Sequence, residues 1–208
     1  MNNVPHFYSI FSQCISDYHQ IHDIHQRINH SLNNSFPDNS LEYLLYRKNH
    51  IDNVQWDLED LIRDPKILPE KALQLKRRID KSNQDRTDIV EKIDDLFLGK
   101  FKDISPEKDA RINTESISWA LDRLSILALK IYHMQLQTER KDAGESHRKS
   151  CLKKLSILEV QKKDLIQAIH ELMEDIAAGK RMMKVYRQMK MYNDPALNPV
   201  LYSSKKKS

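Results

Sequence analysis

The sequence predicts an all-α protein: a single antiparallel bundle of five long helices and a short C-terminal helix, built around one apolar central helix. First, a composition of 31% charged and 39% hydrophobic residues with only 3 glycines is typical of long helices. Second, the 7 prolines all fall outside the stretches with helical periodicity. Third, apolar residues recur at helical spacing through five long stretches. We assign residues 1–202 to the bundle and residues 203–208 to a basic disordered tail.

Residues 115–137, ESISWALDRLSILALKIYHMQLQ, predict the central helix. Apolar side chains occupy both of its sides, with Leu121 on one side and Trp119 on the other. A helix that is apolar nearly all round must be surrounded by other elements. Its length would also suit a membrane span, but Asp122 and Arg123 interrupt it, and charges at bilayer depth are expensive. We therefore expect this helix at the centre of a soluble bundle.

Residues 6–32 predict the first helix, with a heptad seam in which His25 stands at an apolar position. His19, His22 and His25 follow one another at three-residue steps, so their imidazoles could approach one ion. Metal sites usually draw ligands from more than one element, so we favour solvated His19 and His22 and a hydrogen-bonded core His25. No metal site is assigned.

The second helix is expected from Asn39 or Ser40 to the residue before the Asp64-Pro65 pair. A polar stripe lies on the side of this helix opposite its core stripe. By the helix period, the members of the polar stripe fall within about 80° of one another. The members of this stripe are Asn49, Asn53, Trp56, Asp60 and Arg63. A tryptophan among amides and charges calls for a second packing layer, a partner surface or a ligand, and we favour the packing layer.

The third helix is expected to open at Pro69 and to run to about Leu98, before Gly99. Asn83 and Arg86 interrupt its apolar seam. A buried, unpaired guanidinium costs several kcal/mol, so Arg86 must meet a carboxylate or an anionic ligand. Both alternatives stay open, and the candidate internal partners are Asp60, Asp80, Asp88 and Asp122.

The remaining boundaries follow from capping residues and composition. Asn113 or Thr114 is expected to cap the central helix, and residues 145–178 predict a long helix that ends before a glycine. Residues 181–192 predict the short amphipathic helix. Residues 193–202 are expected to form an ordered cap folded across the bundle.

Charge and cysteine content indicate the environment of the protein. The net charge of +4 includes the lysines of the tail, so the chain carries no basic footprint for specific nucleic-acid recognition. The start of the chain lacks a secretory signal pattern, and no uninterrupted apolar span occurs. Cys14 and Cys151 occupy apolar seam positions and are expected to be reduced core residues. These features favour a cytoplasmic protein, and the seven-residue seams would also suit a homo-oligomer.

The motifs of common catalytic sites are missing. The sequence has no Glu-x-x-His pair, Gly-rich phosphate loop, Gly-x-Ser-x-Gly elbow, Cys-x-x-Cys or His-Glu-x-x-His. We therefore do not expect a di-iron carboxylate bundle, a P-loop enzyme or a nucleophile-based hydrolase, and no cofactor is assigned. Binding of an anionic or polyhydroxy ligand by Arg, Lys, His and Asp side chains remains open.

Four long stretches resemble one known family. They are WDLEDLIRDP (56–65), KRRIDKSNQDRTDIVEKID (76–94), ESISWALDRLSILALKIYH (115–133) and QMKMYNDPALNPVLY (188–202). Together they are similar to the bacterial domain-of-unknown-function family 4254. The resemblance implies no activity, but it implies a bacterial protein of Bacteroidetes-like lineage, sometimes encoded near glycosyltransferases of surface-polysaccharide assembly. The segment RRIDKSNQDR also resembles the first helix of all-helical chorismate mutases, over a short and common pattern.

We expect a polar site between the second, third and central helices that binds an anionic or sugar-like small molecule, within surface-polysaccharide metabolism. Arginines would hold the anionic group, amides the hydroxyls and the tryptophan a ring, while an aspartate would act as general base or arginine partner. The predicted ligand-binding residues are Asn49, Asn53, Trp56, Arg63, Asn83, Arg86 and Arg123, and the predicted catalytic residues are Asp60 and Asp122. The alternative is a non-catalytic adaptor or scaffold partner of a glycosyltransferase-pathway enzyme, in which the same residues fix the packing.

Overall fold

The computed structural model describes residues 3–191 and 194–204, and this part of the chain contains helices and no strand. The helices are α1 (Val4–His19), α2 (Ile24–Arg27), α3 (Leu41–Leu61), α4 (Pro69–Lys100), α5 (Ile117–Glu139), α6 (Glu145–Ala177) and α7 (Pro199–Ser204). The all-α prediction is confirmed. No described helix is both long enough and apolar enough to cross a membrane.

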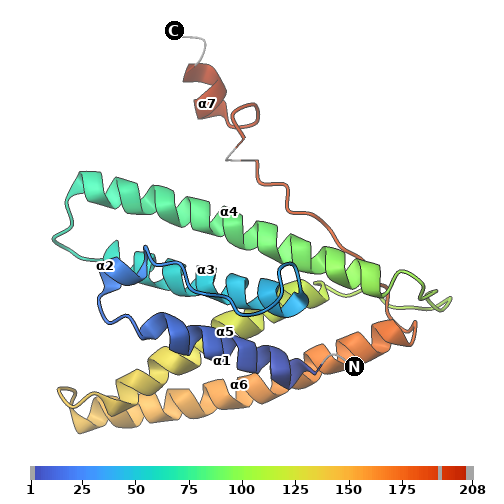
Figure 1. Cartoon of the computed structure of the whole chain (residues 1–208), viewed down its shortest axis with the longest axis horizontal. Coiled ribbons are helices and arrows are strands. Elements are labelled where there is room, and N and C mark those ends of the chain that lie inside the picture. The colour runs from blue at the N-terminus through green and yellow to red at the C-terminus, as the bar shows by residue number, and fades with distance from the viewer. Residues whose placement is uncertain (1–2, 192–193, 205–208) are drawn as a thin grey trace.

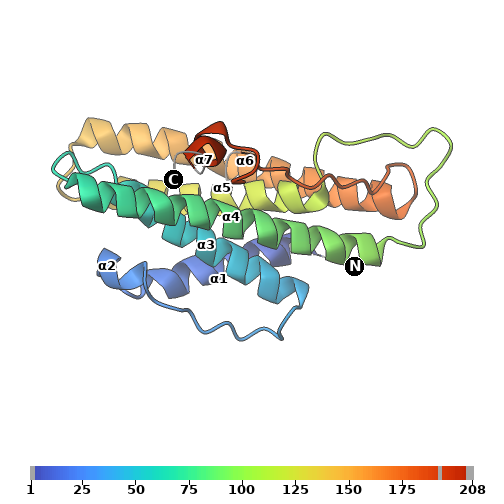
Figure 2. The ribbon, with the colours of Figure 1, turned by 90° about the horizontal axis from the view of Figure 1, so that it is seen from above.

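The helix α5 lies at the centre of the bundle, where it packs against α1, α3, α4 and α6 (Figures 1 and 2). Two antiparallel hairpins, α3–α4 and α5–α6, make most of the helix-to-helix contacts. Figure 1 shows that α1 and α3 instead run in the same direction, because the chain between them returns along the bundle before α3 begins. The interior is therefore formed where α3, α4 and α5 pack together, with α1 and α6 also packed against α5.

The first predicted helix is wrong in its length, because the helix breaks after His19. The carboxylate of Asp23 accepts a hydrogen bond from the backbone N–H of Gln26 at 2.7 Å and so caps the separate short helix α2. The side chain of Arg27 then turns inward to the buried Asp57. His25 is exposed and not a core histidine. A local cap and an inward ion pair together override the heptad pattern.

Two other helix ends also differ from the prediction. The hydroxyl of Ser116 accepts the N–H of Trp119 at 3.3 Å, so Ser116 caps α5, and not Asn113 or Thr114. Helix α4 continues through Gly99 to Lys100, and Phe101 is buried directly after it. Burial of this aromatic ring favours another helical turn over a stop at the glycine.

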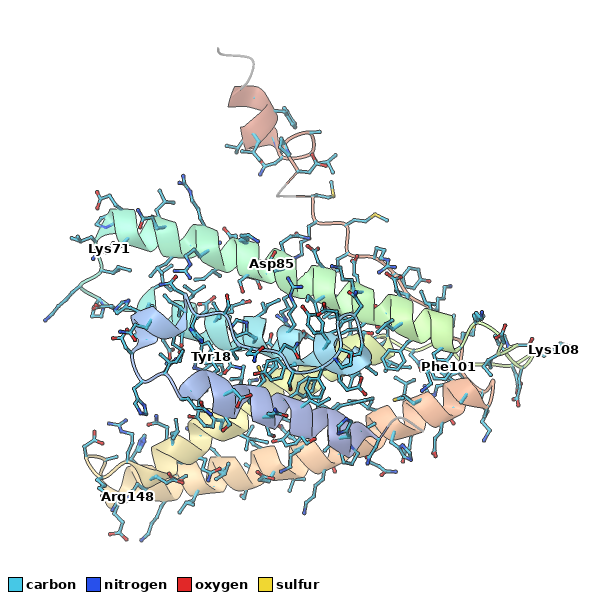
Figure 3. All side chains as sticks on the ribbon, in the orientation of Figure 1. Tyr18, Lys71, Asp85, Phe101, Lys108 and Arg148 are labelled. Atoms are coloured by element: carbon cyan, nitrogen blue, oxygen red, sulfur yellow. The ribbon has the colours of Figure 1, made fainter. Side chains whose placement is uncertain are left out.

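The hydrophobic core has one large cluster and one small one. The large cluster joins residues of α1, α3, α4, α5 and α6, among them Phe7, Phe11 and Leu124. The small cluster lies at the other end of α3 and contains Leu58 and Ile79. In Figure 3, Tyr18 lies among the helices, whereas Lys71, Lys108 and Arg148 lie at their ends. The large cluster surrounds the polar interior described below.

The C-terminal part differs most from the prediction. Residues 181–191 are extended and not helical, because the backbone N–H of Met182 donates to the carbonyl of Arg111 and the chain forms a bridge there. The short helix is α7, and Figure 1 shows it standing away from the bundle, so the predicted cap across the bundle is wrong. Tyr192, Asn193 and residues 205–208 of the predicted tail lie outside the described residues.

Candidate functional site

The side chains of Lys48 and Asp52 on α3, Arg86 on α4 and Asp122 on α5 form a charge network inside the bundle. The ammonium of Lys48 lies 2.5 Å from Asp52 Oδ2 and 2.8 Å from Asp122 Oδ1, and its side chain is 1% exposed. The guanidinium of Arg86 binds Asp122 with two hydrogen bonds, of which Nε to Oδ1 measures 2.7 Å. Two cations therefore face two carboxylates, and the network is neutral.

The ion pair of Arg86 with Asp122 provides one of the two kinds of partner predicted for this arginine, a carboxylate. Asp122 was one of the four candidate partners, and Asp52 Oδ1 lies 3.7 Å from Arg86 Nε as a second carboxylate. The Arg86 side chain is 27% exposed, whereas the side chains of Asp52 and Asp122 are 1% and 5% exposed. Arg86 is thus the residue of the network that reaches the surface.

The two carboxyl groups differ in their pKa. Burial by itself would raise the pKa of Asp122, but Lys48 and Arg86 lower it below its usual value. Burial raises the pKa of Asp52 against the opposing charge of Lys48, and the nearby Asp122 raises it further. Asp122 therefore remains an anion that holds Arg86, and a proton entering the network goes to Asp52.

The side chains of Asn49, Asn53 and Ser125 extend the network through hydrogen bonds to Asp52 and to one another. Asn49 Nδ2 donates to Ser125 Oγ at 2.9 Å, and Ser125 Oγ donates to Asp52 Oδ2 at 2.6 Å. Asn53 Nδ2 donates to Asn49 Oδ1 at 2.9 Å. Asn49 and Asn53 are 0% and 1% exposed, so these two predicted ligand residues support the network from inside.

Arg86 and Asp122 line two grooves on the surface of the bundle. The first, here called the α6 groove, lies between α4, α5 and α6 and has a volume of about 690 Å³. The second, here called the C-terminal groove, lies between α4, the start of α5 and the extended residues after α6, with a volume of about 540 Å³. Both grooves share Arg86, Asp122 and Arg123. The exposed side of Arg86 therefore joins them.

Three positive side chains gather around this junction, and two further carboxylates line the grooves with them, Asp164 in the α6 groove and Glu115 in the C-terminal groove. Lys130 lines the α6 groove and Lys184 lines the C-terminal groove. Arg123 is paired with Glu115 at 3.0 Å, and its side chain is 68% exposed. Within residues 3–191 and 194–204, no ion pair of Lys130 or Lys184 is found, so both are available to an anion.

Rings and neutral polar groups complete the C-terminal groove. The indole of Trp119 and the phenol of Tyr186 lie on its walls, and Tyr186 is 71% exposed. Ser116 and Gln188 also line it. The groove can thus offer flat surfaces to a ring and hydrogen bonds to hydroxyls.

The other predicted site residues lie elsewhere. Trp56 stacks on the imidazole of His133, with ring centroids 4.3 Å apart. Asp60 is exposed, and the exposed Arg63 pairs with Glu59 at 2.6 Å. Asn83 Oδ1 accepts a hydrogen bond from Gln55 at 2.9 Å. None of these four predicted residues lines either groove.

Several residues of the site were missed in the sequence. Lys48 follows the buried Leu44 by four residues, and Asp52 follows Lys48 by four, so the spacing placed both on the core side of the helix. Two opposite charges four residues apart, in line with a core leucine, could have predicted this buried ion pair. Lys130 and Lys184 gave no comparable signal, because exposed lysines are common.

A second buried cluster lies where α1, α3 and α5 meet. Asp57 accepts hydrogen bonds from the Tyr18 hydroxyl at 2.8 Å and from Arg27 at 2.7 and 3.0 Å. The imidazoles of His19 and His133 pack beside this group, with ring centroids 5.4 Å apart. Burial lowers the pKa of both histidines to about 4. Among the described residues, no group of three or more His, Cys, Asp or Glu side chains is arranged to hold a metal ion.

Comparison with known families shows to which family the chain belongs. The model of a family described as protein of unknown function (DUF4254) matches residues 42–185. The chain belongs to DUF4254. The matched part runs from α3 through α6 and includes the whole charge network and Lys184, while Tyr186 and Gln188 follow it. No curated protein and no solved structure matches the chain.

Proposed function

We propose that this DUF4254 protein binds an anionic small molecule that carries a ring, such as a phosphorylated or nucleotide-linked sugar, at the junction of its two grooves. One observation carries the proposal: Arg86 is held in place by a buried network, yet it faces grooves where Lys130 and Lys184 form no ion pair with any described residue, although Asp164 and Glu115 also line these grooves. A fixed guanidinium beside such ammonium groups is suited to phosphate or carboxylate.

The geometry of Arg86 supports this role. Its Nε and Nη2 atoms bind Asp122, which leaves Nη1 for a ligand. Because Asp122 and Asp52 hold the guanidinium, little conformational entropy is lost when an anion binds. Arg123 and Lys130 stand on α5 beside it and would add charge to the same anion. Trp119 would contact the ring of the ligand.

The proposal assigns binding and no chemical reaction. A carboxylate with a lowered pKa is a weak base, so Asp122 serves as the partner of Arg86 and not as a general base. Asp60 lies outside both grooves. The resemblance to the family implies a gene that is sometimes encoded near glycosyltransferases. Nucleotide sugars are the donors that glycosyltransferases use, so they are suitable candidate ligands. We accordingly place the protein in the bacterial cytoplasm, in surface-polysaccharide metabolism.

The experiment is a thermal-shift screen with nucleotide sugars, sugar phosphates and divalent metals, followed by calorimetry of any compound that raises the melting temperature. Replacing Lys130 by Ala removes a charge-assisted contact of about 1.5 to 3 kcal/mol, so the Kd is expected to rise about tenfold or more. Arg140→Ala is the matched control, because Arg140 forms an exposed ion pair with Asp142 on another part of the bundle. An unchanged Kd in Lys130→Ala and in Arg86→Lys would show that the ligand binds elsewhere.

The second candidate function is an adaptor for a glycosyltransferase-pathway enzyme. One observation favours it: Leu152, Ile157 and Val160 on α6 are 54%, 51% and 56% exposed. Neighbouring exposed apolar side chains are typical of a contact surface. If no compound stabilises the protein, we expect co-purification with such an enzyme to be lost in Ile157→Ser/Val160→Ser. Co-purification should persist in Leu73→Ser, where the leucine is 52% exposed on α4. The same patch would serve a homo-oligomer, which gel filtration of the double variant tests.

A further inference from the structure

The extended residues 184–190, here called the strap, form one wall of the C-terminal groove. Lys184, Tyr186 and Gln188 belong to the strap, and they line the groove together with Arg86 and Trp119. The wall facing them is formed by α4 and α5. The groove therefore exists only when the strap lies against the bundle.

The chain is firmly attached just before the strap. The N–H of Met182 donates to the carbonyl of Arg111 at 2.9 Å, and the N–H of Arg111 donates to the carbonyl of Lys180 at 3.0 Å. Arg181 forms an ion pair with Asp175 at 2.8 Å, and Met183 packs against the core. The start of the strap is thus fixed to the bundle.

The strap itself follows a row of side chains on α4. Asn83, Thr87, Glu91 and Asp95 are spaced four residues apart, so they lie on one face of the helix. Lys190 donates to the Asn83 carbonyl at 2.9 Å and to Thr87 Oγ1 at 2.7 Å. Further along the row, the N–H of Gln188 donates to Glu91 at 3.0 Å, and Arg187 binds Asp95. The strap therefore runs antiparallel to α4, as Figure 1 also shows.

These contacts hold the strap weakly. The side chains of Arg187 and Asp95 are 42% and 58% exposed, and ion pairs as exposed as this one contribute little to stability. Tyr186 and Met189 are 71% and 89% exposed, so little apolar surface is buried along the strap. Among the described residues, no backbone-to-backbone hydrogen bond joins residues 184–190 to the bundle. A segment held in this way opens at low free energy.

We propose that the strap is a gate over the ligand site: it detaches from the α4 row by turning about Met183, admits an anion to Arg86, and closes with Lys184 against it. This inference rests on the proposed function and adds its regulation. Because Arg187 is held by exposed ion pairs with Glu91 and Asp95, salt favours the open strap, whereas Lys190 contributes hydrogen bonds to neutral groups. Tyr186 and Met189 stay exposed in the closed state and Val185 is half-buried, so closure depends mainly on these polar contacts.

The first test is hydrogen–deuterium exchange of the full chain without any ligand. The amide of Gln188, which donates to Glu91 in the closed strap, is expected to exchange several-fold faster at about 0.5 M salt than at low salt, because screening weakens the ion pairs of Arg187. Arg187→Ala/Lys190→Ala should show the fast exchange already at low salt. Arg140→Ala removes an equally exposed ion pair elsewhere and should leave the strap unchanged. If the double variant exchanges like the wild type, these contacts do not hold a gate, and the proposal is wrong.

The second test uses a nucleoside diphosphate as the probe in stopped-flow binding. The paired substitutions Glu91→Cys and Gln188→Cys place one thiol on α4 and one on the strap, and a disulfide between them, confirmed by mass spectrometry, locks the strap. The native Cys14 and Cys151 are buried and do not compete. The locked protein should bind and release the probe about tenfold more slowly than the same variant after reduction. Arg187→Ala/Lys190→Ala should release the probe several-fold faster.

The outcomes separate the gate from the site. Binding to the wild type with unchanged rates in the locked and double variants would overturn the gate alone. Absence of binding to the wild type and to every variant would overturn the ligand site and the gate with it. Slow rates in the locked protein that reductant reverses would support both.

Discussion

At the scale of single residues, Lys48 is central to the interior. Its ammonium lies between the carboxylates of Asp52 and Asp122, and water reaches almost none of it. Buried ion pairs contribute little net stability compared with apolar residues of the same shape, but removal of one partner leaves an uncompensated charge. The network is therefore more important for the position of Arg86 than for the stability of the fold.

Replacing Lys48 by Met tests this view. The substitution leaves Asp52 without its closest cation, so the free energy of unfolding is expected to fall by about 3 to 5 kcal/mol. The double variant Lys48→Met/Asp52→Leu removes both charges and should recover most of the loss. Urea unfolding of the two variants and the wild type provides the measurement. Equal losses in the single and double variants would show that the pair is not coupled.

The histidines of the second buried cluster make stability depend on pH. The pKa of His19 and of His133 falls from 6.5 to about 4, chiefly because of burial; the nearby Arg27 also lowers it, and Asp57 opposes the shift. Between these two pH values the unfolded chain binds more protons than the folded protein. The free energy of unfolding is therefore highest above pH 6.5 and falls as the pH is lowered toward 4.

A melting-temperature series from neutral to acidic pH checks this dependence. His133→Phe keeps a ring against Trp56 and removes one titrating group, so its melting temperature should fall less steeply with acidification. His25→Phe makes the same replacement at an exposed position on α2 and is the matched control. The same slope in both variants would assign the pH dependence to other groups.

At the scale of elements, two glycines with the same predicted role behave differently. Gly179 has φ +74° after α6, and a Cβ there would lie 2.9 Å from the carbonyl oxygen of Ser105. Gly99 lies inside α4, and a Cβ there would meet nothing within 4 Å. Helical spacing alone does not separate the two, because only the conformation after the last helical turn requires a left-handed residue.

Alanine at each position gives a matched pair of predictions. Gly179→Ala is expected to lower the free energy of unfolding by about 2 kcal/mol, from backbone strain and the close carbonyl. Gly99→Ala should raise it by about 0.5 to 1 kcal/mol, because alanine loses less conformational entropy in a helix. Denaturant midpoints of the two variants measure the difference. A stabilising Gly179→Ala would mean that the chain does not turn there as described.

The helix boundaries that could be predicted are those set by residues close to them in the sequence. The ends of α3 and α6 and the start of α4 follow from local caps, turn residues and a first-turn proline, and the predictions agree with the structure within a few residues. The break after His19 depends on the inward pair of Arg27 with Asp57, which comes from another helix. The extended strap depends on backbone pairing with Arg111. Contacts across the chain decided both.

At the scale of the whole molecule, α1 completes the core although it lies outside the family match. The match begins at residue 42, while α1 buries a row of apolar side chains against the rest of the bundle. Phe7, Phe11 and Tyr18 on α1 are 2%, 0% and 0% exposed. The unit that folds is therefore larger than the matched segment.

Deletion of residues 1–39 should prevent stable folding. Each large buried side chain contributes about 1.5 to 3 kcal/mol, so the loss of α1 exceeds the usual stability of a domain. We expect a truncated chain that aggregates or shows no cooperative melting by circular dichroism. Deletion of residues 194–208 is the control, because α7 stands apart from the bundle. A cooperative melt of the N-terminal truncation, at a temperature close to that of the full chain, would contradict this assignment.

The sequence by itself determined the helical fold, the central position of residues 115–137 and the need of Arg86 for a carboxylate or an anionic ligand. These follow from periodicity and from the cost of burying an unpaired charge, which are local properties. Only the tertiary structure decided that Asp122 holds Arg86, that Trp56 and Arg63 lie elsewhere, and that Lys130 and Lys184 line the same grooves as Arg86. The physical reason is that side chains from three helices meet according to how the helices pack, and spacing within one helix carries no information about its neighbours.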